Sequence, residues 1–535
     1  MGNPIEKQSI IRWRNAIIFA LGTLISRGLG LVRDILMGWY VPDFARDTFL
    51  FAFRLPNTLR DLLGEGALNA SFVPILSECE KKEGIEKLRI ITNAILTIMT
   101  LLLLFISVIG VLIMPLVPYL LEGLRVLTQG TQKTEEQMRN TVLILQLTFP
   151  YLFWIGIAVF LMAPLFVIGN YKIPGIVPAL LNIPWILSIF IPNFTNIDIS
   201  LSLVIGVWVG GILQFVVLYI YVNKLIGRVK LTTNIKYPEV SKAFFLILPV
   251  ILGQAAGEIN KLVDSFFSYS LSEGTVSALF YANRLIQLPL AIFGTAISVS
   301  ILPELTRYTV DNEKEKMKTA LIEGLFQTWF MIIPTMVILS LLSEPVVRFL
   351  FQRGEFSPLL TQKTANAVVI YSIGIIGFSG VKVLVQGFYA MNLTTIPVIV
   401  SSFSMLLNVI LNVITVRKLG YIGLVLSTTI SFWVNFLLLY ILLGKKIGTL
   451  FDKNFGIQLL KYITATLVVV ISFFFVNLLF NHFEKEKSVI LFIYISIMGG
   501  VSVIVYIVVG YLLKIRELSQ IIRIIEIKAV KFMNF

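Results

Sequence analysis

The chain has 535 residues, of which 57% are hydrophobic and only 14% are charged. Soluble proteins carry about 25% charged residues, so this composition excludes a soluble globular fold. Lys and Arg outnumber Asp and Glu by 44 to 30; in a membrane protein this excess fits loops that face anionic lipid, and we expect no nucleic-acid partner. One Cys and one His exclude a disulfide framework and a Cys/His zinc cluster.

Long apolar stretches broken by charged or turn residues predict an all-α polytopic membrane protein, since each span needs about 20 apolar residues. We expect the first stretch to stay in the mature protein, because charges interrupt it and no small-residue cleavage site follows. In chain order, the fourteen predicted helices cover 15–40, 46–76, 89–118, 140–168, 174–192, 198–223, 240–270, 275–305, 318–343, 362–391, 394–416, 420–444, 457–480 and 488–513.

The loops predict the orientation of these helices. An even number of spans puts both termini on one side, and the loops on that side carry roughly twice the Lys and Arg of the opposite loops. The positive-inside rule then places both termini in the cytoplasm. The tail at 514–535 alternates Ile pairs with charges, which predicts a basic amphipathic helix in the membrane interface.

An internal repeat predicts two lobes. Ala-Phe-Arg54-Leu in the second helix recurs as Ala-Asn-Arg284-Leu in the eighth. Repeats of six helices each enter the membrane from the same side, so the lobes would be related by a pseudo-two-fold axis along the membrane normal, with a cavity between them. The predicted parts are an N-terminal lobe at 1–230, a C-terminal lobe at 231–450, two further helices at 451–513 and the tail at 514–535.

Charges inside the spans predict a substrate. An ionisable side chain at the bilayer centre costs at least ~2.5–3.5 kcal/mol, so it marks a wet cavity, an ion pair or a function. Arg27, Arg60 and Arg284 come from three helices and would repel one another unless an anion joins them. A guanidinium fork suits phosphate oxygens, so we expect an anionic substrate that bears phosphate.

Ion pairs that fix helix packing are the alternative for other charges. Arg33, Arg54 and Lys261 each have an acid within a turn or two. A membrane-embedded enzyme would need a clustered metal or acid/base site, and the carboxylate pair Asp61 and Glu65 fits charge balance or gating better. We therefore predict a transporter without enzymatic activity and with no organic cofactor.

Glycines in the first two helices predict flexible points. Gly28 and Gly30 lie in the first helix, and Gly64 and Gly66 flank Glu65 in the second. Glycine destabilises a helix but permits bending and close helix approach. These residues predict a hinge or gate for alternating access, with plain small-residue packing as the alternative.

The charged segments resemble one family. They read Ser26-Arg27-Gly-Leu-Gly-Leu-Val-Arg33-Asp34, Asp47-Thr-Phe-Leu-Phe-Ala-Phe-Arg54, and Tyr281-Ala-Asn-Arg284-Leu-Ile-Gln-Leu-Pro289. In these segments the chain resembles the MurJ/MviN family of lipid II flippases, within a superfamily that includes multidrug (MATE-type) and oligosaccharide exporters. The resemblance implies that an arginine set holds the diphosphate of lipid II and that helices thirteen and fourteen form a groove for the undecaprenyl tail. The substrate-site residues would be Ser26, Arg27, Arg33, Asp47, Arg54, Arg60 and Arg284.

Some members of that family bind sodium in the C-terminal lobe. The resemblance implies that the corresponding positions are Asp264, Asn408, Asn412 and Thr428. Asn412 stands where a carboxylate is expected, and a hard cation prefers carboxylate oxygens. We therefore expect a sodium site at these residues, but one that binds the ion more weakly because Asn412 replaces a carboxylate.

The resemblance implies a flippase that moves lipid II, the undecaprenyl-diphosphate-linked peptidoglycan precursor, from the inner to the outer leaflet of the bacterial cytoplasmic (inner) membrane by alternating access. The alternative is an exporter of another polyprenyl-linked oligosaccharide or of drugs; a drug carrier would need mainly acidic and aromatic cavity residues. The expected partners are lipid II, membrane lipids and the cell-wall synthesis machinery, and we expect a monomer.

Overall fold

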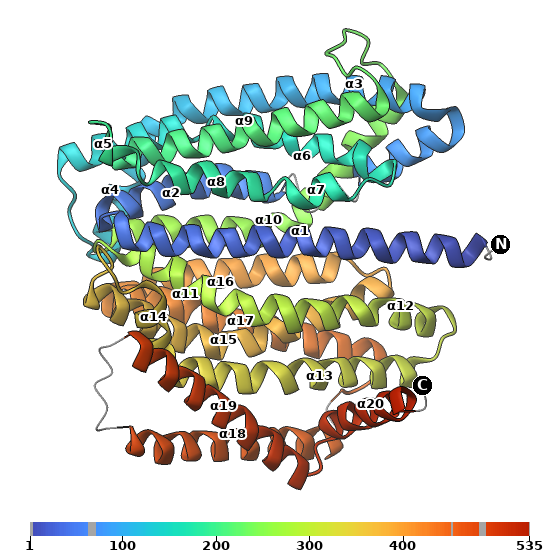
Figure 1. Ribbon diagram of the computed structural model, residues 1–535, viewed down its shortest axis with the longest axis vertical. Helices are drawn as coiled ribbons and strands as arrows, with labels where there is room; N and C mark the ends of the chain where they lie inside the picture. Colours follow the sequence, from blue (N-terminus) through green and yellow to red (C-terminus); the bar gives the residue numbers. More distant parts are fainter. Residues whose placement is uncertain (1–3, 63–70, 451–452, 481–487, 534–535) are drawn as a thin grey trace. The chain divides into compact units, whose positions relative to one another are not determined.

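The computed structural model describes residues 4–62, 71–450, 453–480 and 488–533. Within these ranges it consists of helices with no strand (Figure 1), which confirms the all-α class. Eleven helical stretches of the described residues are long and apolar enough to cross a membrane, so the chain is a multi-pass membrane protein. The predicted count of fourteen is compatible with this number but is not confirmed by it. The other three predicted spans overlap α1 (Pro4–Tyr40), α2 (Asp43–Asp61) and α10 (Pro238–Ser270).

The chain forms two compact units. Unit 1 comprises Met1–Ser277 and Arg353–Phe356, and unit 2 comprises Ala278–Gln352 and Ser357–Phe535. α10 therefore packs within unit 1, although it would open the second predicted repeat. The predicted repeat follows the order of the spans in the sequence, whereas the units follow which residues pack together. The predicted lobe boundary therefore stays a prediction.

In unit 1, α8 and α6 both pack against α9, and α6 also packs against α3. α1 lies along α7 and α8, where a Cβ on Gly22 would come within 2.6 Å of the Gly175 backbone; only glycine permits this close crossing. The remaining helices of unit 1 are α3 (Val73–Ile113), α4 (Val117–Thr128), α5 (Glu135–Thr148), α6 (Tyr151–Val167), α7 (Lys172–Ile176), α8 (Ala179–Ser188) and α9 (Ile199–Ile226).

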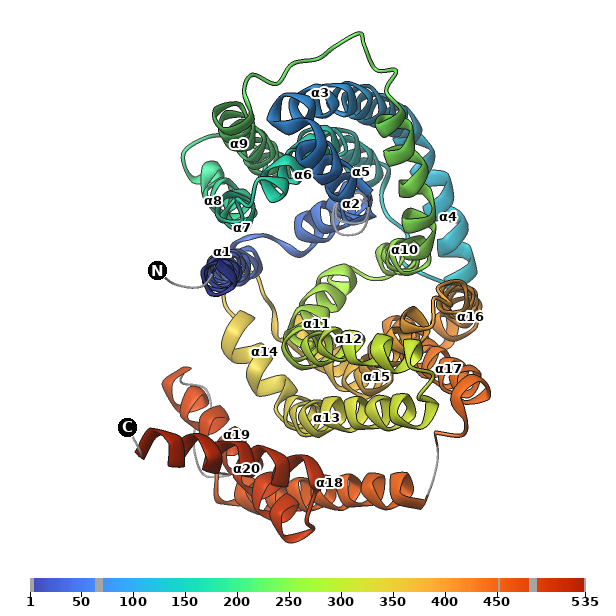
Figure 2. The same ribbon diagram turned by 90° about the vertical axis from the view of Figure 1, so that its right-hand side faces the viewer.

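In unit 2, α15 lies at the centre and packs against both α13 and α17 (Figure 2). Leu321, Trp329 and Phe436 contribute to the core between them. α11 (Thr275–Pro289) begins in unit 1 and continues into unit 2. The other helices are α12 (Ala296–Val310), α13 (Lys314–Leu341), α14 (Ser343–Phe351), α15 (Pro358–Ala390), α16 (Thr395–Leu419), α17 (Tyr421–Ile447), α18 (Lys453–Leu479), α19 (Ser488–Leu512) and α20 (Arg516–Met533).

The helix ends follow local sequence signals. Thr134 and Gln137 form a reciprocal capping box at the start of α5, and Ser357 caps α15 ahead of Pro358. The structure describes the predicted span 46–76 in two parts, because residues 63–70 lie outside the described ranges: α2 ends at Asp61, and α3 begins at Val73. α3 then runs through a kink at Gly84, where φ is +77°.

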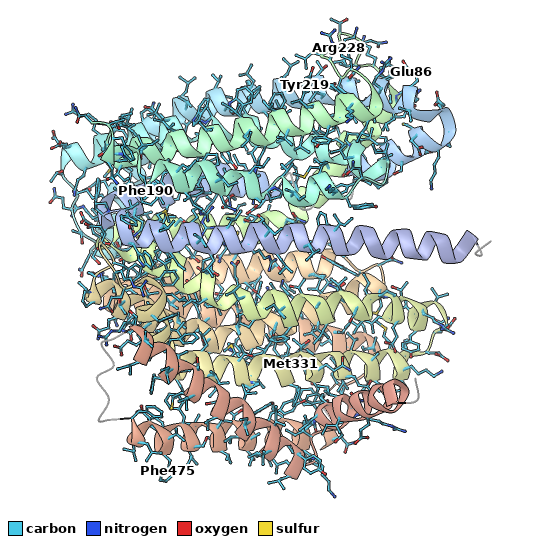
Figure 3. All side chains as sticks on the ribbon, viewed as in Figure 1. Glu86, Phe190, Tyr219, Arg228, Met331 and Phe475 are labelled. Atoms are coloured by element: carbon cyan, nitrogen blue, oxygen red, sulfur yellow. The ribbon has the colours of Figure 1, made fainter. Side chains whose placement is uncertain are left out.

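The helices α18 and α19 pack against each other. Phe473 is buried, whereas Phe475 is 68% exposed and points away from the rest of unit 2 (Figure 3). An exposed aromatic row of this kind fits lipid contact. The predicted tail helix is present as α20, and its location in the membrane interface stays a prediction.

Candidate functional site

Arg33 on α1 is buried and paired inside unit 1. Its Nε and Nη2 both donate to Asp34 Oδ1, at 3.0 and 2.6 Å, and its Nη1 donates to Asn182 Oδ1 at 3.0 Å. Its guanidinium carbon lies 3.9 Å from the ring centroid of Trp185. These contacts fix α1 against α8, as the ion-pair alternative expects. A direct contact with substrate stays a prediction.

Asn182 and Trp185 are partners that the sequence analysis missed. Asn182 also donates from Nδ2 to the carbonyl oxygen of Ser26, at 3.1 Å. The Asn182 side chain on α8 therefore contacts α1 at two positions, Ser26 and Arg33. The sequence did contain a signal for Asn182: it is an amide inside the apolar span 174–192, where a polar side chain without a hydrogen-bond partner is costly.

Arg27 has a different environment from Arg33. Its side chain is exposed on α1, and no described residue forms an ion pair or hydrogen bond with it. A guanidinium in this state is available for an anion. Of the predicted substrate residues in unit 1, Arg27 therefore has the geometry that best fits a phosphate contact.

The last turns of α2 carry a polar cluster. Arg60 Nη2 donates to Asp61 Oδ1 at 2.5 Å, and Asn57 Nδ2 donates to Asp61 Oδ2 at 3.3 Å. The Arg60 side chain is 30% exposed. Arg54, two turns earlier, is half-buried. A doubly charged diphosphate would compete with the single Asp61 carboxylate for Arg60.

Asp47 on α2 is a capping residue for another helix. One carboxylate oxygen accepts from the backbone N–H of Gly274 at 2.7 Å, and the other accepts from the backbone N–H and the hydroxyl of Ser277, at 2.8 and 2.5 Å. These donors lie at the N-terminus of α11, where a carboxylate is favoured by unpaired N–H groups. Asp47 thus holds the first turn of α11, and a direct substrate contact stays a prediction.

Arg46, next to Asp47, is absent from the predicted site and is completely buried. Its guanidinium donates to Ser277 Oγ, to backbone carbonyls at the end of α1, and to Asp43. Nearby, Lys133 lies 4.4 Å from the ring centroid of Tyr269, and burial lowers the pKa of the Lys133 ammonium group.

Arg284 on α11 is half-buried in unit 2, with its guanidinium carbon 5.5 Å from the ring centroid of Phe280. The predicted convergence of Arg284 with Arg27 and Arg60 stays a prediction. On α10, Lys261 forms an ion pair with Glu258 at 2.5 Å, as the ion-pair alternative expects.

Three of the four expected sodium residues come together in unit 2. Asn412 Nδ2 donates to Asn408 Oδ1 at 2.7 Å, and Asn408 Nδ2 donates to Thr428 Oγ1 at 3.2 Å. This trio joins α16 to α17 in unit 2 and supplies no carboxylate, whereas Asp264 belongs to unit 1. The three side chains bond to one another and offer a hard cation only amide and hydroxyl oxygens, which it prefers less than carboxylates. The sodium site therefore stays a prediction.

The predicted gate falls partly outside the described residues, which exclude Gly64, Glu65 and Gly66. α1 is helical through Gly28 and Gly30. Among the described residues outside the adjoining part of α1, none lies within 4 Å of a Cβ placed on Gly28, and the Asn182 amide approaches one on Gly30 at 3.9 Å. The hinge and plain small-residue packing both stay predictions.

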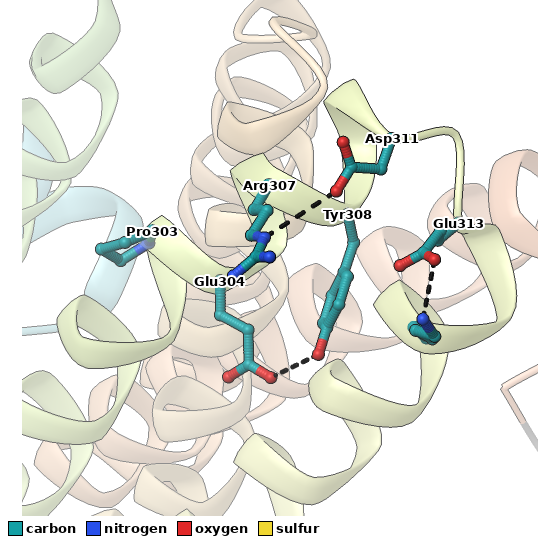
Figure 4. Close-up of a pocket in the computed structure, with 7 residues that line it drawn as sticks. Pro303, Glu304, Arg307, Tyr308, Asp311 and Glu313 are labelled. Atoms are coloured by element: carbon teal, nitrogen blue, oxygen red, sulfur yellow. Dashed lines mark hydrogen bonds and ion pairs between the residues drawn. The ribbon is translucent and has the colours of Figure 1, made fainter.

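A cavity of about 650 Å³ lies where α12 turns into α13 (Figure 4). Its lining carries three carboxylates against two cations. Lys316 pairs with Glu313 at 2.7 Å and Arg307 with Asp311 at 3.8 Å, while Glu304 accepts from the Tyr308 hydroxyl at 2.9 Å. This excess of carboxylates does not favour an anionic ligand. Its lining residues are Pro303, Glu304, Arg307, Tyr308, Asp311, Glu313 and Lys316.

Comparison with known proteins decides the family. The family described as "Lipid II flippase MurJ" matches residues 42–497 of this chain. The chain belongs to the MurJ family. This confirms the resemblance, and the match covers most of both units.

Curated members of the MurJ family align over most of their length. A protein named probable lipid II flippase MurJ from Vibrio cholerae is 34% identical over 433 residues, which are 80% of this chain and 82% of that protein. One of the same name from Bdellovibrio bacteriovorus is 28% identical over 512 residues, which are 95% of this chain and 96% of that protein.

Solved structures agree with this assignment. A lipid II flippase MurJ in an inward closed conformation matches with a TM-score of 0.75 and 25% identity, over 93% of this chain and 98% of that one. An inward-facing multidrug MATE transporter of the MOP superfamily matches with a TM-score of 0.62 and 16% identity, over 81% of this chain and 98% of that one. The second match shows the shared fold, as expected for the superfamily.

Proposed function

We propose that this chain is a lipid II flippase, which moves the undecaprenyl-diphosphate-linked peptidoglycan precursor from the inner to the outer leaflet of the bacterial cytoplasmic membrane by alternating access. The observation that carries the proposal is the family match over residues 42–497, together with relatives of that name that align over most of their length. No bond is made or broken, so the protein acts as a transporter. Both termini lie in the cytoplasm, as the loop charges favour.

The arginines have separate tasks in this proposal. Arg27 contacts the diphosphate of the substrate, which is supported by its exposed guanidinium. Arg60 and Arg284 contribute further phosphate contacts, and Arg60 exchanges Asp61 for the substrate. Arg33 keeps α1 in place against α8, because its guanidinium is already bound to Asp34 and Asn182.

The membrane potential favours this direction of transport. It contributes ~2.3 kcal/mol per elementary charge per 100 mV, so a diphosphate with two negative charges gains roughly twice that amount on moving outward across the whole field. Sodium is therefore not required by the energetics of the head group. The protein works as a monomer in contact with membrane lipids, and the cell-wall synthesis machinery takes up the flipped product.

Transport of a fluorescent lipid II analogue in proteoliposomes tests the proposal. We expect Arg27→Ala to lower the flipping rate by at least about tenfold, because a charge-assisted contact contributes about 1.5–3 kcal/mol. Arg307→Ala is the matched control, since its side chain is 82% exposed and lies on α12. Equal rates for the wild type and Arg27→Ala would contradict the phosphate contact.

The same assay addresses the rival function. A polyprenyl diphosphate that carries a different oligosaccharide is offered in place of lipid II. We expect slower transport of that substrate. Faster transport would show an exporter of another polyprenyl-linked saccharide.

A further inference from the structure

Arg46 is a fully buried arginine whose donors reach three parts of the chain. Nε donates to Ser277 Oγ at 2.9 Å, and Nη1 donates to the carbonyl oxygens of Gly38 and Val41, at 3.0 and 2.9 Å. Nη2 pairs with Asp43. A single guanidinium thus joins the end of α1, the start of α2 and the first turn of α11. An arginine's planar fork suits such multiple contacts better than a lysine.

A second segment covers this guanidinium from a distant part of the sequence. The guanidinium carbon of Arg46 lies 5.4 Å from the ring centroid of Phe356. The neighbouring Arg353 lies 4.7 Å from the ring of Trp39, and the backbone N–H of Glu355 donates to the Trp39 carbonyl at 2.9 Å. Arg353–Phe356 belongs to unit 1. These contacts exclude water from Arg46, which strengthens its hydrogen bonds.

Ser277 links Arg46 to Asp47. Its hydroxyl accepts from Arg46 Nε and donates to Asp47 Oδ1. Asp47 also accepts from the backbone N–H groups of Gly274 and Ser277. A buried carboxylate is stable only when it is paired and hydrogen-bonded, so the two charges support each other through one hydroxyl. Arg46 and Asp47 together hold the first turn of α11 in place.

Helix α11 carries Arg284 in its third turn, and it is helical from Thr275 to Pro289. We propose that Arg46 is a positioning residue for transport: through Ser277 and Asp47 it sets the direction of α11, and so the place of the Arg284 guanidinium. This inference rests on the proposed function, in which Arg284 contacts the diphosphate of lipid II. In this proposal Asp47 acts by holding α11 in place and not by contacting the substrate.

Ser277→Ala tests this role with a small change. It removes the hydroxyl link and leaves the backbone N–H of Ser277 on Asp47. We expect amide hydrogen exchange at Gly274–Ser277 to rise at least about tenfold, and the Kd for lipid II to rise by a similar factor, because the hydroxyl's two hydrogen bonds to charged groups, from Arg46 and to Asp47, are lost. Ser502→Ala is the control, since Ser502 is equally buried and its hydroxyl donates only to the carbonyl of Met498 in its own helix. Unchanged exchange and affinity in Ser277→Ala would overturn the proposal.

A double-mutant cycle separates this proposal from the proposed function. If Ser277 acts through Arg284, Ser277→Ala adds no further loss of affinity in an Arg284→Ala background. A full additional loss overturns the positioning role alone. Normal lipid II affinity in Arg284→Ala overturns the phosphate contact of Arg284, and the positioning role with it. Arg46→Lys, which keeps the charge and loses the fork, is expected to behave as Ser277→Ala does.

Discussion

The prediction on Arg33 separates a packing role from a substrate role. Arg33→Met removes two hydrogen bonds to Asp34, one to Asn182 and the stacking on Trp185, while it keeps the volume of the side chain. The Arg33 and Asp34 side chains are only 8% and 0% exposed. Removing one partner of a buried ion pair destabilises a protein by about 3–5 kcal/mol. We therefore expect a strong loss of stability.

The single cysteine of the chain offers the assay. Cys79 is buried, so a thiol-reactive dye reports its exposure as the protein unfolds on heating. We expect the apparent melting temperature of Arg33→Met to fall by several degrees, and Arg33→Met with Asp34→Asn to recover part of that loss, because the double variant buries no lone charge. A wild-type melting temperature for Arg33→Met, combined with lost lipid II binding, would refute the packing role and show a phosphate ligand.

Three further predictions follow from local geometry. Gly22→Ala should lower the melting temperature, because its Cβ would lie 2.6 Å from the backbone of α7. Gly28→Ala should keep the wild-type melting temperature, because its Cβ would have no contact within 4 Å among the described residues outside the adjoining part of α1. Slower flipping by Gly28→Ala would support the hinge, and wild-type flipping would contradict it. Tyr462→Phe removes the 2.6 Å hydrogen bond to the buried Glu517, so amide exchange in α20 should rise severalfold; unchanged exchange would show that this bond does not hold the helix. Asn412→Asp should make the melting temperature depend on sodium, since it adds the carboxylate that this trio lacks, and a curve independent of sodium would contradict a cation site there.

The helices and the family were predictable from sequence because span-length apolar stretches and the charged motifs are local signals. The predicted spans 240–270 and 488–513 have nearly the same bounds as α10 and α19, and the predicted span 15–40 ends where α1 ends. The set of Asn408, Asn412 and Thr428 was also identified: the three side chains form hydrogen bonds between α16 and α17, and the sodium site itself stays a prediction.

The partners of the arginines on other helices could not be predicted, whereas local acids such as Asp34 beside Arg33 could be. Arg46 lies at the start of a span, where a cation usually flanks the membrane, and nothing local indicates that Ser277 and Phe356 surround it. The pairing of Arg33 with Asn182 likewise joins residues of α1 and α8. Sequence pattern shows that a charge lies inside a span, but only the packing shows whether that charge is satisfied by the protein.

The central claim is that exposed guanidinium groups of this chain bind a polyprenyl diphosphate. Native mass spectrometry of the purified protein measures this binding directly, with Arg27→Ala, Arg60→Ala and Arg307→Ala as variants. The account predicts that lipid II remains bound to the wild type and to Arg307→Ala and is lost from Arg27→Ala and Arg60→Ala. Equal retention of lipid II by all four proteins would contradict it.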